Sequence, residues 1–142
     1  KNEKEFTEEA LQAKYLVIKE WGVKFRLSDS TQDVVYKFKE NGSNWVIVTT
    51  SRLDELSLNN PACSGADEST TISRARVGDD RFGSPWSEQD LRNIGVKVED
   101  YYYFTEGGQP CFDTDKNLAS VVAEIGLIRS ELSKISETVV KQ

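Results

Sequence analysis

The sequence predicts an α+β domain in which an N-terminal helix packs on a small antiparallel sheet and a long helix ends the chain. Three observations predict this class. Apolar residues recur at helical spacing near both ends, apolar and polar residues alternate in several middle segments, and Gly, Pro, Asn and Asp separate the segments. The 142 residues and 37% hydrophobic content are typical of one folded domain.

The first expected element is a helix that begins after Thr7 and ends near Gly22. Thr7 is a favourable N-cap residue, and the acidic residues that follow it suit the positive end of a helix. Phe6 and Leu11 are spaced to form a hydrophobic staple around this cap. The apolar residues further along predict a broad face that packs on the sheet.

The expected sheet includes a strand at 23–27, where apolar and charged residues alternate, and a β-hairpin at 34–49. The hairpin is predicted because Asn41-Gly42, the preferred pair for a type I′ turn, lies between two apolar segments. A two-residue turn there predicts three cross-strand pairs: Phe38 with Trp45, Tyr36 with Ile47, and Val34 with Thr49.

The middle of the chain predicts a long polar surface loop at 52–70, a strand at 72–77 and a turn at 78–83. A short internal helix is expected at 87–94, with Ser87 at its start and Gly95 past its end. One strand is then expected over 96–105.

The last expected element is an amphipathic helix over 115–141, whose apolar residues are spaced alternately by three and four positions. This heptad pattern divides the chain into a head at 1–114 and a helix at 115–142. The helix either packs on the head as part of one domain or forms an oligomerising stalk. The self-association interface would then consist of Leu118, Val121, Ile125, Ile128, Leu132, Ile135 and Val139.

Cys63 and Cys111 both lie in turn-rich segments, whereas free cysteines are usually buried. We therefore expect a disulfide between them and an extracytoplasmic location, which is periplasmic, cell-surface or secreted. The alternative is two unrelated thiols in a cytosolic protein. The chain starts at Lys1 and contains no Met, which suggests a processed protein or a piece of a longer one, and any membrane anchor would lie outside this sequence.

The composition argues against several kinds of chemistry. The chain has no His, so histidine-based catalysis and zinc sites are excluded, and we expect no enzymatic activity. The net charge of −6 argues against nucleic-acid binding. No cofactor is expected except possible calcium, because Asp113, Asp115, Asn117 and Glu124 match positions 1, 3, 5 and 12 of an EF-hand loop. Leu118 stands where that loop needs Gly, and helix capping by Thr114 or Asp115 is the alternative.

These observations predict a non-enzymatic structural or interaction domain, an oligomerising subunit or ectodomain of a surface or extracellular assembly. Tyr101, Tyr102 and Tyr103 form a candidate binding surface or, alternatively, the two faces of an ordinary internal strand. A second possible function is a ligand-sensing ectodomain of a membrane receptor.

A third possible function comes from a resemblance. An N-terminal helix, a short antiparallel sheet and one disulfide resemble the globular part of a type IV pilin, in topology and in the spacing of Cys63 and Cys111. This resemblance implies an apolar stem upstream of Lys1.

Overall fold

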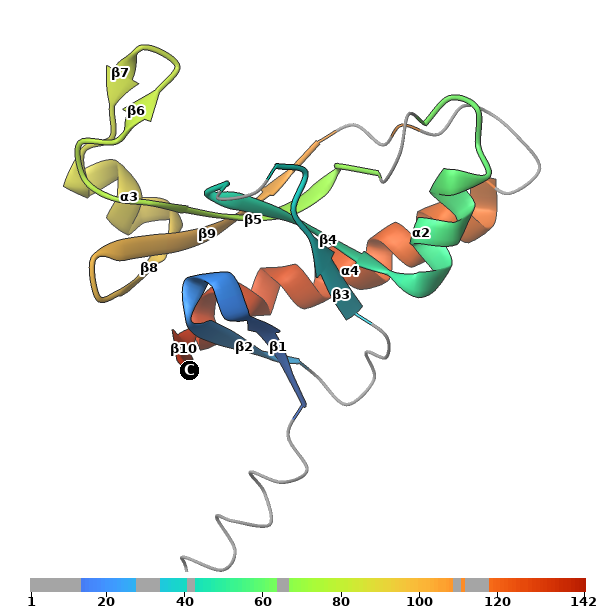
Figure 1. Ribbon diagram of the computed structural model, residues 1–142, viewed down its shortest axis with the longest axis horizontal. Helices are drawn as coiled ribbons and strands as arrows, with labels where there is room; N and C mark the ends of the chain where they lie inside the picture. Colours follow the sequence, from blue (N-terminus) through green and yellow to red (C-terminus); the bar gives the residue numbers. More distant parts are fainter. Residues whose placement is uncertain (1–13, 28–33, 41–42, 64–66, 109–110, 112–117) are drawn as a thin grey trace, which may run out of the picture.

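A computed structural model describes residues 14–27, 34–40, 43–63, 67–108, 111 and 118–142 (Figure 1). Within these residues the strands form three antiparallel sheets. The largest has the spatial order β3 (Val34–Lys37), β4 (Trp45–Thr50), β5 (Thr70–Ala75), β9 (Tyr101–Gly107) and β8 (Val96–Val98). The second contains β1 (Lys14–Ile18), β2 (Val23–Leu27) and β10 (Val140–Lys141), and the third is the hairpin of β6 (Asp80–Arg81) and β7 (Ser84–Pro85).

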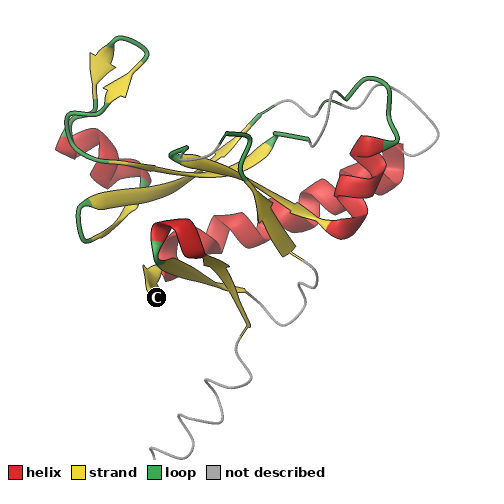
Figure 2. Cartoon of the chain, viewed as in Figure 1, coloured by secondary structure: helices red, strands yellow, loops and turns green. Residues whose placement is uncertain are grey.

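The helical segments are the 3₁₀ turn η1 (Lys19–Trp21), α2 (Ser51–Leu58), α3 (Glu88–Ile94) and α4 (Leu118–Thr138) (Figure 2). Two of them begin at side-chain caps: Thr50 Oγ1 accepts a hydrogen bond from the backbone N–H of Leu53 at 3.0 Å, and Ser87 Oγ accepts one from Asp90 at 3.2 Å. These caps satisfy backbone donors that a helix start leaves unpaired.

The main core lies between one face of the five-stranded sheet, helix α4 and the β1–β2 pair. Its sheet residues alternate along each strand, as in Val46 and Val48 on β4, because successive side chains point to opposite faces. The opposite face carries a second, smaller core under α3, in which Leu91 packs against Ala75 and Phe104. Both faces of the central strands are therefore covered over part of their length.

The predicted fold class is wrong, because the described chain is mainly β-structure and the described part of the predicted N-terminal helix, residues 14–22, forms a strand and a 3₁₀ turn instead. Residues 14–18 form β1, in which Leu16 and Ile18 are buried while Tyr15 and Val17 are half-buried. The sequence shows no such alternation, because residues 15–18 are all apolar, and Tyr15 and Ile18 also fit the spacing of a helix face. β-Branched residues favour the extended form once β2 is available as a partner. The resemblance to a type IV pilin depended on that helix and has no support in the described structure.

The other helix and loop predictions are corrected in part. Residues 51–58 of the predicted loop form α2, which starts at the Thr50 cap. Helix α4 ends at Thr138, and residues 140–141 pair with β2 instead of continuing the helix. The internal helix is confirmed as Glu88–Ile94 with Ser87 as its cap.

The hairpin at 34–49 is confirmed, but its predicted register is wrong by one residue. Tyr36 pairs with Val48 and Val34 with Thr50, because the connection is longer than the two residues assumed. A shift of one residue moves side chains to the other face. Trp45 and Ile47 therefore lie opposite the main core, where Trp45 lines a groove.

Candidate functional site

A short β-hairpin, residues 78–86, projects from the five-stranded sheet and is called the arm (Figure 1). Backbone hydrogen bonds from Gly78 to Trp86 and from Trp86 to Asp79, both 2.8 Å, close its base. Its tip is a two-residue turn, Phe82 and Gly83, whose φ angles are 50° and 91°. Positive φ at both positions is the pattern of a type I′ turn, which favours Asn and Gly.

Phe82 is an unfavourable residue for this position in two ways. A bulky residue in the left-handed region carries backbone strain of about 1–3 kcal/mol. Its side chain is also 100% exposed, so none of its apolar surface is removed from water. A residue with two such costs at the end of a projecting hairpin is typical of an anchor that becomes buried in a complex.

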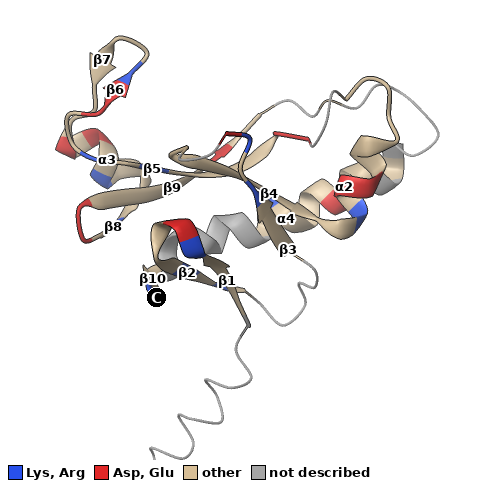
Figure 3. Ribbon diagram, viewed as in Figure 1, with Lys and Arg blue, Asp and Glu red and all other residues tan. Residues whose placement is uncertain are grey.

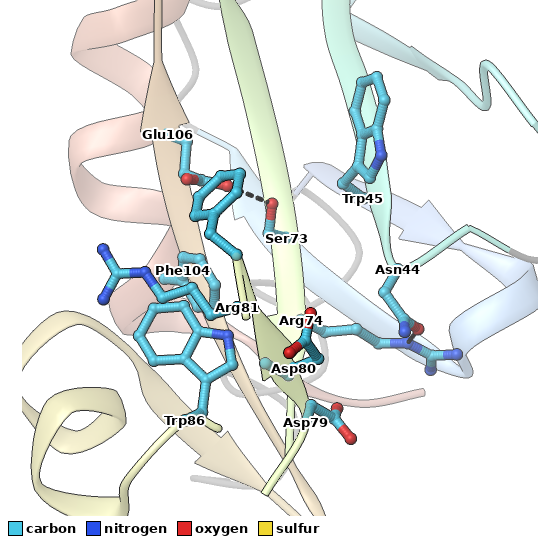
Figure 4. A pocket seen from close by; sticks show the side chains of 12 residues that line it. Asn44, Trp45, Ser73, Arg74, Asp79, Asp80, Arg81, Trp86, Phe104 and Glu106 are labelled. Atoms are coloured by element: carbon cyan, nitrogen blue, oxygen red, sulfur yellow. Dashed lines mark hydrogen bonds between the residues drawn. The ribbon is translucent and has the colours of Figure 1, made fainter. Parts of the chain in front are cut away.

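Beside the arm, the outer face of the sheet forms an open groove of about 510 Å³ (Figure 4). Its floor consists of Ser73 and Ala75 from β5 with Phe104 and Glu106 from β9, which share one face because residues two apart point the same way. The remaining residues that line it are Asn44, Trp45, Arg74, Asp79, Asp80, Arg81, Phe82 and Trp86.

Aromatic side chains stand on both sides of the groove. Trp45 lies on β4 at one side and Trp86 lies at the base of the arm at the other (Figure 4). The Trp86 ring packs 5.6 Å from that of Phe104, measured between centroids, and joins the small core under α3. The guanidinium of Arg81 stacks 4.3 Å from the centre of the Trp86 ring. The groove thus combines rigid apolar walls with a cation held on one of them.

Charged residues of both signs line the groove, and Figure 3 shows an acidic and a basic position next to each other at β6. One oxygen of Glu106 accepts a hydrogen bond from Ser73 Oγ at 2.8 Å, and the residue is exposed. Asp79 accepts from the backbone N–H of Arg76 at 2.8 Å and so stabilises the start of the arm. Arg81 has no ion pair with any carboxylate in the described part of the chain. Arg81 and Glu106 are therefore available to charged groups of a ligand.

The three tyrosines proposed as a binding surface lie in different surroundings. Tyr103 is buried in the main core and Tyr102 in the small core, whereas Tyr101 is half-exposed. Arg74 stacks on Tyr101 with 4.1 Å between its guanidinium carbon and the ring centre. Burial raises the pKa of Tyr103 above its ordinary value, and Arg74 opposes that rise in part. Only Tyr101 is placed to contact a partner.

The disulfide between Cys63 and Cys111 is confirmed. It joins the segment after α2 to the segment after β9, with a Cα–Cα distance of 5.1 Å across 48 positions of sequence. A buried carboxylate supports the junction: Asp67 accepts hydrogen bonds from the Cys111 backbone at 3.1 Å and from Ser69 Oγ at 2.6 Å. The disulfide agrees with an oxidising compartment, although it does not establish one.

Four of the seven predicted oligomerisation residues are buried in the core of their own chain. Val121, Ile125, Ile128 and Val139 are buried in the main core, where α4 contacts the sheet. The side chains of Leu118, Leu132 and Ile135 lie outside the described set. Three of these residues on α4, and Val139 just after its end, thus pack within their own domain, and self-association through the heptad pattern stays a prediction.

The predicted calcium ligands Asp113, Asp115 and Asn117 lie outside the described residues. Glu124 is on α4 and is half-exposed. Among the residues that are described, no three Asp, Glu, Cys or His side chains lie close enough to hold a metal ion. The calcium prediction is therefore not tested.

Sequence reasoning missed the arm and the groove. The segment 78–83 was predicted as a turn, and its one unusual feature, an aromatic residue before Gly83 in a polar turn, was the available signal. Trp45 and Trp86 lie 41 positions apart and line one groove because only β5 separates β4, which carries Trp45, from β9, against which Trp86 packs. No local pattern contains that information.

Comparisons with protein-family models, with curated proteins and with solved structures found no match. Within the described residues, no helix has both the length and the apolar character required to span a bilayer.

Proposed function

We propose that this chain is a non-enzymatic, extracytoplasmic interaction domain of a cell-surface or extracellular assembly, and that it binds a partner through the arm and the groove. The observation that carries the proposal is Phe82, a fully exposed aromatic residue at a strained position on a projecting turn. Folding alone would favour Asn or Gly there. Binding energy from a partner that buries the ring offsets both costs.

Several features of the groove support binding rather than catalysis. The chain has no His, the most common general base. Ser73, the one hydroxyl on the floor, donates to Glu106 and is buried. Trp and Arg side chains such as Trp86 and Arg81 are the residue types that contribute most to protein interfaces. The Cys63–Cys111 disulfide supports the extracytoplasmic part of the proposal.

Site-specific photo-crosslinking in the native cells tests the proposal. Benzoyl-phenylalanine replaces Phe82 in one variant and Val122 in another, since Val122 is also apolar, is 62% exposed and lies on α4 away from the groove lining. We expect protein adducts from position 82 that are absent from position 122. Equal adducts at both positions, or none at position 82, would contradict the proposal.

A ligand-sensing ectodomain is the second candidate, because two tryptophans line a groove whose volume is within the ~300–1,000 Å³ of small-molecule sites. Trp fluorescence and melting temperature, measured with millimolar amino acids and mono- and disaccharides, test this function. A saturable change that is lost in Trp45→Phe supports it. No change with any of these compounds argues against sensing of those two ligand classes.

A further inference from the structure

We infer that the groove binds the arm of a second copy of this chain, in a two-fold symmetric dimer. The inference rests on the proposed function, because it identifies the partner of the same arm and groove. In this dimer the Phe82 ring of each copy enters the groove of the other copy and packs between its tryptophans. The dimer thus contains two equivalent contacts, each between the arm of one copy and the groove of the other.

The projecting residue and the groove that can accept it lie on the same face of one chain. Phe82 is at the tip of the arm and the groove begins at its base. In a two-fold dimer the same surface patch of the two copies is in contact. A patch that contains both the arm and the groove therefore supplies both sides of that contact. The 510 Å³ groove is large enough for a phenyl ring and the turn that carries it.

Aromatic contacts stabilise the inserted ring. Trp45 and Trp86 flank the groove, and Phe104 lies on its floor (Figure 4). Aromatic pairs with centroids about 4.5–7 Å apart contribute beyond the burial of their area. Trp86 is already positioned by its 5.6 Å contact with Phe104, so little side-chain freedom is lost when a second ring arrives.

The charges of the patch are also self-complementary. Arg81 has no ion pair among the described residues, and one carboxylate oxygen of Glu106 accepts no hydrogen bond from any described donor. Because Arg81 precedes Phe82 in the arm, entry of the arm into the other groove brings Arg81 of one copy toward Glu106 of the other, and two-fold symmetry repeats this ion pair. The net charge of −6 on each copy repels at long range, but salt screens this repulsion beyond about 8 Å at physiological ionic strength.

Other routes to self-association are less favoured by the structure. The α4 residues Val121, Ile125 and Ile128 are buried in the chain's own core, so a coiled coil through them would require that core to open. A contact limited to one arm and one groove per copy is small compared with the ~800 Å² per partner of a stable interface. We therefore expect a weak dimer that exchanges rapidly with monomer.

Sedimentation equilibrium of the full, disulfide-intact chain at up to millimolar concentration measures the dimer. We expect concentration-dependent dimerisation that Phe82→Asn weakens at least tenfold. Asn tolerates positive φ, so this variant should melt at an equal or higher temperature than the wild type, which separates lost association from lost folding. The control Val122→Asn changes an equally apolar, exposed side chain on α4 and should leave the dimer constant unchanged.

A charge exchange gives the decisive result. Arg81→Glu and Glu106→Arg should each weaken self-association at least tenfold, because each places like charges across both symmetric contacts. A mixture of the two variants should associate again as a heterodimer, since every Glu then faces an Arg. A wild type that stays monomeric, or a mixture that does not associate, overturns the inference. If position 82 nevertheless crosslinks to a different protein in cells, the dimer is wrong and the proposed function stands.

Discussion

Removal of the disulfide by the double substitution Cys63→Ser/Cys111→Ser should greatly destabilise the fold. In the chain-entropy model, a crosslink across 48 positions removes about 4 kcal/mol of conformational entropy from the unfolded state. Native domains are stable by only ~5–15 kcal/mol, so this change is a large fraction of the total. The native structure itself should change little, because the backbone of Cys111 keeps its hydrogen bond to Asp67.

Urea unfolding followed by Trp fluorescence measures this loss. With an m-value of ~2 kcal/mol per molar urea, a loss of about 4 kcal/mol lowers the unfolding midpoint by about 2 M. The wild type under reducing conditions is the matched control, and it should unfold near the midpoint of the double variant. A loss below about 1 kcal/mol would refute the entropic argument. Two free thiols found by non-reducing mass spectrometry of the native protein would contradict the pairing and remove the support for an oxidising compartment.

Three further substitutions test the packing. Gly95→Ala places a Cβ 2.7 Å from the carbonyl oxygen of Tyr103, so strand β9 must shift, and we expect a loss of about 1–3 kcal/mol with a lower melting temperature; unchanged melting would contradict this close approach. Thr50→Ala removes the cap of α2 and should lower the unfolding free energy by about 1 kcal/mol, measured in urea, whereas no loss would mean that the cap is dispensable. Burial raises the pKa of Tyr103, and burial followed by the hydrogen bond to Glu20 raises that of Tyr36. The folded state thus holds both phenolic protons more tightly, and this stability, present below about pH 10, is lost as the pH rises through the folded-state pKa values. Tyr103→Phe should flatten the fall of the urea midpoint between about pH 9 and 12, and an equally steep fall in that variant would contradict the assignment.

The elements that sequence analysis predicted correctly depend on residues close together in the chain. Ser87 caps α3 because its hydroxyl reaches a backbone N–H only three residues away. The hairpin at 34–49 was recognisable because two apolar segments flank a turn signal. The register of this hairpin could not be predicted, because it depends on which face of β4 packs on the main core. Residues far along the chain form that core.

The wrong predictions concern segments whose local pattern fits two structures. Residues 14–18 satisfy a helix and a strand about equally, and pairing with β2 and packing against α4 select the strand. The heptad pattern of α4 is a different case: its spacing fits a second copy and its own sheet equally, so both structures were left open, and self-association through it stays a prediction. The sheet lies beside it, so Val121 and Ile128 are core residues.

By itself, the sequence determined the covalent and compositional facts about this protein: a cysteine pair in turn-rich segments, the lack of His, the acidic charge and the Ser87 helix cap. These depend on residue identity and on hydrogen bonds or turns a few residues long. Only the tertiary structure decided that β5 and β9 bring Ser73 and Glu106 together between two tryptophans, and that Phe82 stands exposed beside them. That arrangement depends on strand order and on which strand faces point outward, and long-range packing sets both.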